Sequence, residues 1–172
     1  MVKSTLLTMI NPAAYPIRYT LCFLTRGEEV LMLHRHNPPN QGLWNGVGGR
    51  LEKGESPREG VIREVREETG FCLQEVRFAG LLTWDGFETP PGGLYIFTAE
   101  VPEGEAAVCS EGELAWKPRS WVFSAPEVVS NIHVFAPLMF ADDGSKHYHF
   151  SYRDGEIDQY EIHPLLQRDF YE

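Results

Sequence analysis

Alternating apolar and polar positions recur in short segments of this chain, and that spacing predicts β-strands. The segments are rich in β-branched and aromatic side chains, and turns of Gly, Pro, Asn and charged residues separate them. We expect a hairpin from two strands at 17–26 and 30–35, further strands at 75–84 and 93–101, a short strand around Trp116 and a final hairpin at 147–162.

The strand at 75–84 and the final hairpin allow more detailed expectations. Val76, Phe78, Gly80, Leu82 and Trp84 alternate, which places them on one side of their strand. In the hairpin, Asp154 and Gly155 form a dipeptide favoured at a two-residue turn.

Two histidines of this hairpin also share a face. His147 and His149 alternate with Tyr148, Phe150 and Tyr152. Two histidines on one face could bind a metal, but we interpret them as an exposed face of the strand.

A helix is predicted between two complete end signals. Ser56 is placed to cap its start, Pro57 fits the first helical position, and Glu59 completes a capping box. Gly70 stands where a helix commonly ends in a left-handed residue. Residues 36–49 form a Pro-, Asn- and Gly-rich loop before it. Residues 125–142 read as helical pieces broken near Asn131 and at Pro137.

The helix between these signals has an apolar anchor and an acidic face. Val61 and Val65 point one way, whereas Glu64, Glu67 and Glu68 lie on another stripe. Like charges three and four positions apart destabilise a helix by roughly 0.2–0.5 kcal/mol per pair. Such crowding calls for a reason, and a bound cation would supply one.

Composition narrows the classes of protein that fit. The 172 residues, 42% of them hydrophobic and 23% charged, suit a single domain over 1–172. A net charge of −10 disfavours a nucleic-acid polymer as partner but not a small nucleotide whose phosphates are carried by a metal. No segment approaches the ~18 apolar residues of a membrane span, and no signal peptide is recognisable at 1–16.

The cysteines agree with a reducing compartment, so we expect a cytoplasmic protein. Cys22, Cys72 and Cys109 are odd in number and far apart, without a CxxC pair, which argues against a disulfide framework or a zinc site. Cys22 lies in an apolar run and is predicted to be a small buried hydrophobe.

The acidic stripe belongs to a longer pattern. Gly49 is followed after five residues by Glu55, and after seven more by the run from Arg63 to Phe71, "REVREETGF". Seven fixed residues, each at a frequency of about 10%, coincide by chance in about 10⁻⁷ of windows. The pattern resembles the complete signature of the Nudix hydrolases, with no departure at a fixed position. The resemblance implies an α/β fold, the Nudix α/β/α sandwich, with a mixed β-sheet and a loop-helix-loop motif.

Such chemistry has a physical reason to use clustered carboxylates. Diphosphates resist attack because they are anionic, so catalysis asks mainly for positioning and charge neutralisation. Mg²⁺ or Mn²⁺ held by carboxylates does both and also lowers the pKa of a bound water.

The resemblance implies roles for individual residues. Glu55 and Arg63 would form an ion pair that orients Glu64, and with Glu67 these residues make up the implied catalytic set. The implied metal ligands are Gly49, through its carbonyl, with Glu64, Glu67, Glu68 and Glu111.

The acid outside the helix is not fixed by the pattern. Glu111 lies in a polar loop, and Glu100 and Glu113 are rivals for its position. The residue that activates water could be a glutamate of the helix or this later acid.

Within the family the chain most resembles MutT-like members that hydrolyse oxidised purine nucleoside triphosphates. The implied substrate-binding residues are Arg35, Asn45 and Asn131. Asn45 would contact the purine and Arg35 the phosphates. The animal enzymes have two adjacent aspartates where this chain has "VSNIHVF", with Asn131 and His133, so discrimination of 8-oxoguanine is not implied.

Simpler interpretations stand beside some of these roles. Asn45 precedes Gly46 and could be a turn residue, and Arg35 could be a surface charge at a strand end. We interpret Trp44 as a packing residue.

The leading hypothesis is a metal-dependent enzyme that cleaves a purine nucleoside triphosphate to the monophosphate and pyrophosphate. Hydrolysis of ADP-ribose or a dinucleoside polyphosphate is the alternative among enzymes. A nucleotide-sensing module without catalysis is a third hypothesis. The oligomeric state is open.

Overall fold

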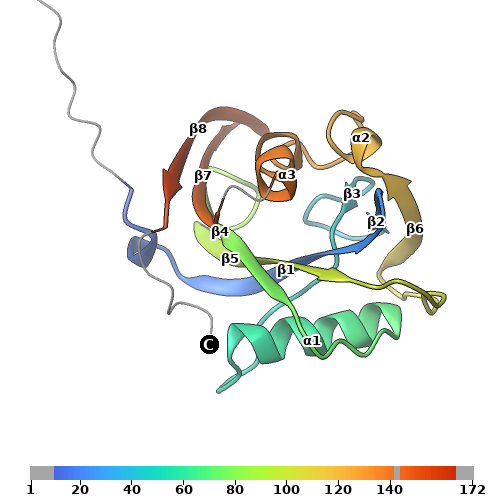
Figure 1. The fold of residues 1–172 in the computed structure, drawn as a ribbon. Helices are drawn as coiled ribbons and strands as arrows, with labels where there is room; N and C mark the ends of the chain where they lie inside the picture. Colours follow the sequence, from blue (N-terminus) through green and yellow to red (C-terminus); the bar gives the residue numbers. More distant parts are fainter. Residues whose placement is uncertain (1–9, 142–143, 166–172) are drawn as a thin grey trace, which may run out of the picture.

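A computed structural model of the chain describes residues 10–141 and 144–165, and it has one mixed β-sheet with helices on both faces (Figure 1). Residues 1–9, where we expect no signal peptide, lie outside the described residues. In chain order the elements are η1 (Pro12–Ala14), β1 (Ile17–Arg26), β2 (Glu29–Arg35), β3 (Trp44–Asn45), α1 (Pro57–Thr69), β4 (Arg77–Asp85), β5 (Gly92–Glu100), β6 (Gly112–Pro118), α2 (Arg119–Val122), α3 (Ile132–Phe140), β7 (Lys146–Arg153) and β8 (Glu156–Pro164).

The sheet combines antiparallel hairpins with two parallel pairings. Its strand order is β3-β2-β1-β5-β4-β7-β8, and β6 pairs with β2. The pairs β1–β5 and β4–β7 are parallel, and the others are antiparallel. The predicted α/β sandwich is therefore confirmed, including the hairpins β1–β2 and β7–β8. None of the helices in the described part of the chain is long and apolar enough to cross a membrane.

Two hydrophobic cores lie on opposite faces of this sheet, and alternating residues of β1 supply both. Cys22 and Leu24 pack with Val61 and Val65 of α1, whereas Phe23 packs in the other core, which α2 and α3 cover. Both valines and Cys22 are fully buried, as predicted, which fixes α1 against the sheet by its apolar side. The three cysteines are free thiols.

The expectation that one face of β4 carries all its alternating residues is wrong. A register shift between Phe78 and Gly80 interrupts the pairing with β5. Phe78 consequently packs in the α1 core, whereas Leu82 packs in the opposite core. A β-bulge adds one residue to a strand and so reverses the direction of the side chains beyond it.

The predicted break of the helix at Pro137 is also wrong. Helix α3 runs from Ile132 to Phe140 with Pro137 inside it, although its start agrees with the predicted break near Asn131. Proline removes one backbone hydrogen bond, here to the His133 carbonyl. Burial of Phe135, among other apolar residues of α3, maintains the helix despite that loss.

His147 and His149 contradict the expected exposed face, because they are 1% and 2% exposed. The Thr83 hydroxyl of β4 lies 2.7 Å from His147 Nε2 and 2.8 Å from His149 Nδ1. The Tyr15 ring lies 5.0 Å from the His149 ring, centroid to centroid. The sequence gives no local sign of burial here, since the partners come from other elements.

The burial of His147 predicts a pH-dependent stability. Burial, reinforced by His149 and His163 and opposed by Glu161, lowers the His147 pKa from 6.5 to about 4. Between these values the unfolded chain binds a proton that the folded chain does not, so stability is full above pH 6.5 and falls as the pH drops toward 4. The loss is on the order of 3 kcal/mol.

Urea unfolding of wild type and His147→Asn at pH 7.5 and 4.5 measures this loss of stability. The variant should lose less stability than wild type over this interval, and equal losses would contradict the assignment.

Candidate active site

Helix α1 begins and ends as its sequence predicts. Ser56 Oγ accepts a hydrogen bond from the Glu59 N–H at 3.2 Å, and Glu59 Oε2 accepts one from the Ser56 N–H at 2.8 Å. Gly70 has φ 80°, and its N–H donates to the Arg66 carbonyl at 2.9 Å. These caps fix where α1 begins and ends, and its buried Val61 and Val65 fix its rotation, so the acidic stripe takes one defined position beside the sheet.

The three acids of the stripe differ in exposure. Glu68 is 6% exposed, the side chain of Glu64 is 15% exposed and that of Glu67 is 53% exposed. The stripe therefore runs from the protein interior at Glu68 to solvent at Glu67.

Arg63 connects most of the carboxylates around it. Its Nε and Nη2 donate to the two oxygens of Glu55 at 2.7 and 3.0 Å, and its Nη1 donates to Glu64 at 2.8 Å and to Glu67 at 3.2 Å. The hydrogen bond from Arg63 lowers the pKa of Glu55, although burial opposes the shift. The structure thus brings together Glu55, Arg63, Glu64 and Glu67, and their catalytic role stays a prediction.

Three carboxyl groups gather where the buried Glu68 and the partly buried Glu64 approach the exposed Glu111. Burial is the main reason that the Glu68 pKa rises to about 8, and the charges of Glu64 and Glu111 add to the rise. The hydrogen bond from the Gly48 N–H and the charge of Arg35 oppose it. The Glu64 pKa is raised as well, by burial first, while Arg63 opposes the shift and Glu67 and Glu111 reinforce it. These carboxylates lie close enough to repel one another.

That donor set fits a divalent cation, because a cation would remove the repulsion and carboxylate oxygens are the ligands that Mg²⁺ and Mn²⁺ prefer. Among the described residues, however, no three Asp, Glu, His or Cys side chains already stand in a metal-binding arrangement. Glu64 and Glu67 contact Arg63 instead, and Glu68 Oε2 accepts a hydrogen bond from the Gly48 N–H at 2.8 Å. Binding of an ion therefore requires these side chains to turn.

Gly49 allows the loop before α1 to approach the acids. A Cβ on Gly49 would lie 2.5 Å from the Glu64 carboxyl carbon, so a side chain there would displace the Glu64 carboxylate. The Gly49 carbonyl accepts a hydrogen bond from the Thr20 N–H at 2.9 Å. The Thr20 hydroxyl donates a second, longer hydrogen bond to the same oxygen at 3.5 Å, and the predicted metal contact would replace this bond.

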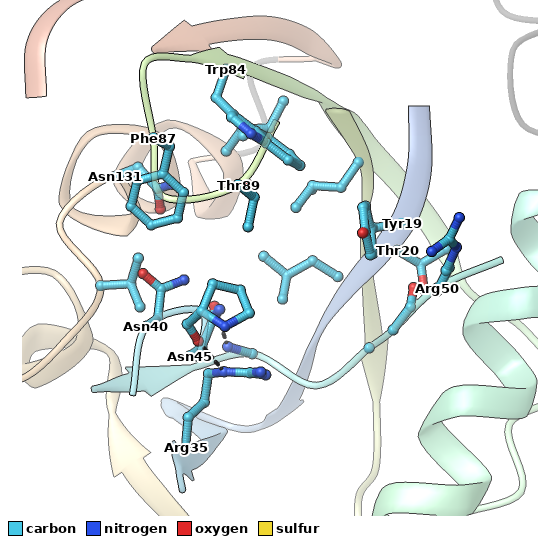
Figure 2. A pocket seen from close by; sticks show the side chains of 18 of the residues that line it. Tyr19, Thr20, Arg35, Asn40, Asn45, Arg50, Trp84, Phe87, Thr89 and Asn131 are labelled. Atoms are coloured by element: carbon cyan, nitrogen blue, oxygen red, sulfur yellow. Dashed lines mark hydrogen bonds between the residues drawn. The ribbon is translucent and has the colours of Figure 1, made fainter. Parts of the chain in front are cut away.

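A pocket of about 360 Å³ extends from this acidic end across the face of the sheet (Figure 2). It contains all three predicted substrate-binding residues and three of the predicted metal ligands. Sequence reasoning missed its aromatic and hydroxyl-bearing wall. The lining residues with polar or aromatic side chains, together with Gly49, are Tyr19, Thr20, Arg35, Asn40, Asn45, Gly49, Arg50, Glu64, Trp84, Phe87, Thr89, Glu111, Asn131 and Tyr152.

Glu111 is the later acid that the structure places at the site. It lines the pocket, and its backbone carbonyl accepts a hydrogen bond from the His36 N–H at 3.0 Å. Glu100 lines a different groove, beside Cys72, and Glu113 pairs with His34 in the sheet.

The predicted substrate-binding residues already have partners within the protein. Asn45 Oδ1 accepts from the Gly46 N–H at 2.8 Å, so Asn45 makes the turn contact while also lining the pocket. Arg35 Nε donates to the Pro39 carbonyl at 2.7 Å. Asn131 Nδ2 donates to the Tyr152 hydroxyl at 3.1 Å.

Other side chains near the site are placed differently. His133 lies 2.8 Å from the Ala125 carbonyl through Nε2 and is not among the pocket residues. Trp44 stacks on His34 and packs beside Trp121, which agrees with a packing role. Phe87 stands in a Gly- and Pro-rich loop, where an aromatic residue is the one sequence signal that could have identified the missed wall.

Known proteins were compared with the chain by sequence and by fold. It matches the NUDIX domain family over residues 16–136. YvcI of Bacillus subtilis (strain 168), an uncharacterized Nudix hydrolase, is 31% identical over 156 residues, which are 87% of this chain and 96% of YvcI. The crystal structure of the MutT protein from Bacillus halodurans is 30% identical with a TM-score of 0.72, over 84% of this chain and 96% of that one.

A mouse protein is similar over a shorter stretch. The oxidized purine nucleoside triphosphate hydrolase of Mus musculus is 27% identical over 99 residues, which are 57% of this chain and 64% of the mouse protein.

Arg63→Lys tests the role of Arg63 in holding the carboxylates. Lysine keeps the charge but cannot donate two parallel hydrogen bonds to Glu55 while it also reaches Glu64. We therefore expect the free energy of unfolding to fall by about 1–3 kcal/mol. Urea denaturation measures the change. Arg66→Lys on the same helix is the control and should be close to wild type. Equal stability of both variants would contradict the role assigned to Arg63.

Proposed function

The chain belongs to the Nudix family, and for this MutT-like hydrolase we propose the cleavage of purine nucleoside triphosphates to the monophosphate and pyrophosphate. One observation carries the proposal: a single pocket extends from Glu64 and Glu111 to a wall of aromatic and amide side chains, and Figure 2 shows this wall. The first end suits phosphates carried by a metal, and the second suits a flat base with polar edges.

Nudix hydrolases generally use Mg²⁺ or Mn²⁺, and in this chain Glu64, Glu68, Glu111 and the Gly49 carbonyl would hold the ion, with Glu67 at the solvent side. When bound, the metal neutralises phosphate charge and acidifies a bound water. Of these carboxylates, Glu64 and Glu111 line the pocket. One of these two would accept the proton that the attacking water releases as the anhydride bond breaks.

Amide and aromatic side chains support the assignment of the base. The Asn131 amide nitrogen donates one of its two N–H groups to the Tyr152 hydroxyl, which leaves the other N–H as a donor and Oδ1 as an acceptor. An acceptor suits an N–H edge of guanine and the additional N–H of 8-oxoguanine, and neither contact needs a charged residue. We therefore propose that both guanine and its oxidised form are substrates, with little discrimination between them.

Incubation with dGTP, 8-oxo-dGTP and ADP-ribose, with and without Mg²⁺, tests the proposal. We expect the triphosphates to yield monophosphate and pyrophosphate only with metal, and Glu67→Gln to lower kcat by several orders of magnitude with unchanged thermal melting. Faster cleavage of ADP-ribose would favour the alternative enzyme, and tight binding without turnover would indicate a sensor. Normal activity of Glu67→Gln would refute its role as a ligand.

Asn45→Ala tests the contact with the base. Loss of one hydrogen bond is expected to raise KM for dGTP by roughly tenfold and to lower kcat less. Steady-state kinetics with dGTP and dCTP measure the effect. An unchanged preference for purine over pyrimidine would leave Asn45 with its turn contact alone.

A further inference from the structure

Two loops border the end of the pocket that lies away from α1, and a hydrogen bond joins them. The 36–42 loop connects β2 to β3, and the 86–91 loop connects β4 to β5. The backbone N–H of Asn40 donates to Glu88 Oε1 at 2.9 Å. This contact, here called the Glu88–Asn40 bridge, links residues 48 positions apart in the sequence.

Both loops contribute to the wall of the pocket. Pro39 and Asn40 come from the first loop, Phe87 and Thr89 from the second. Figure 2 shows Asn40 below Phe87, at the end of the pocket away from Arg50. The bridge therefore joins two neighbouring parts of the pocket wall, next to the residues that would surround the base.

Each loop is also fastened to its own strand. Arg35 Nε donates to the Pro39 carbonyl at 2.7 Å, and Trp84 Nε1 donates to the Pro90 carbonyl at 3.0 Å. Arg35 and Trp84 line the pocket too. A shift of the first loop would consequently disturb Arg35, and a shift of the second loop would disturb Trp84. The bridge therefore affects these two pocket residues in addition to Asn40 and Glu88.

The backbone of both loops supports this arrangement. Asn40 has φ 60°, a left-handed conformation that asparagine tolerates and that orients its N–H. Gly86 has φ 70°, and a Cβ there would collide with the Tyr152 carbonyl, so the 86–91 loop begins tightly against β7.

We propose that Glu88 is a positioning residue for the substrate base, acting through the Glu88–Asn40 bridge. This inference rests on the proposed function. Loops that are joined before the nucleotide binds need less ordering on binding, and such preorganisation strengthens affinity. The carboxylate contributes as a hydrogen-bond acceptor rather than as a charge.

A purely electrostatic role of Glu88 predicts the opposite result. Glu88 is an exposed anion beside a pocket that would take an anionic nucleotide. If its charge alone mattered, removing it would ease binding and lower KM in both Glu88→Ala and Glu88→Gln. If the bridge matters, Glu88→Ala raises KM, whereas Glu88→Gln keeps a carbonyl acceptor and stays close to wild type.

Steady-state kinetics with dGTP and Mg²⁺ separate these roles. We expect Glu88→Ala to raise KM about threefold to tenfold, with a smaller change in kcat, and Glu88→Gln to restore most of the loss. Glu103→Ala removes the same charge from another exposed loop and should leave KM unchanged. A lower KM in both Glu88 variants, or an equal rise in both, would overturn the proposal.

Hydrogen exchange of the Asn40 amide tests the bridge without any nucleotide. In NMR exchange of the metal-free protein, this amide should exchange more slowly in wild type and Glu88→Gln than in Glu88→Ala. Equal exchange in all three proteins would overturn the bridge itself. If exchange differs as expected but no nucleotide is hydrolysed, the bridge stands and the proposed function fails.

Discussion

Repulsion among carboxylates at one end of the pocket is the constraint on which the site depends. Burial raises the pKa of Glu64 and Glu68, and their mutual charge and that of the exposed Glu111 add to the rise. Helix α1 cannot turn to relieve this, because Val61 and Val65 are fully buried on its other side. The fold thus holds the acids together at an electrostatic cost that a cation can remove.

Arg63 acts as the internal counter-ion of this arrangement. It donates to Glu55, Glu64 and Glu67, so its single positive charge offsets part of the negative charge of two predicted metal ligands. A divalent ion must compete with Arg63 for them. The two parallel hydrogen bonds to Glu55 keep Arg63 near its place during such an exchange. The contact with Glu55 is therefore structural, whereas the contacts with Glu64 and Glu67 can be exchanged for the ion.

The sequence predicts well what is determined locally. The caps of α1 and the positions of the strands depend on neighbours a few residues away, and the structure confirms them. Burial of His147 depends on other strands, and the bulge in β4 depends on its pairing with β5. Neither has a local signature. For the same reason, the alternation of His147 and His149 was wrongly interpreted as an exposed face.

The candidate site shows the same difference between features set by nearby residues and features set by distant ones. Its acidic end, apart from Glu111, lies on one helix and the loop before it, within the residues that match the family, and a short sequence pattern therefore identifies it. The opposite wall is assembled from the 36–42 loop, the 86–91 loop and Tyr152, which lies beyond the matched residues. These segments meet only through the sheet order that places β7 beside β4. The chemistry of the site can consequently be read from spacing along the chain, whereas the choice of base depends on contacts that only the folded sheet creates.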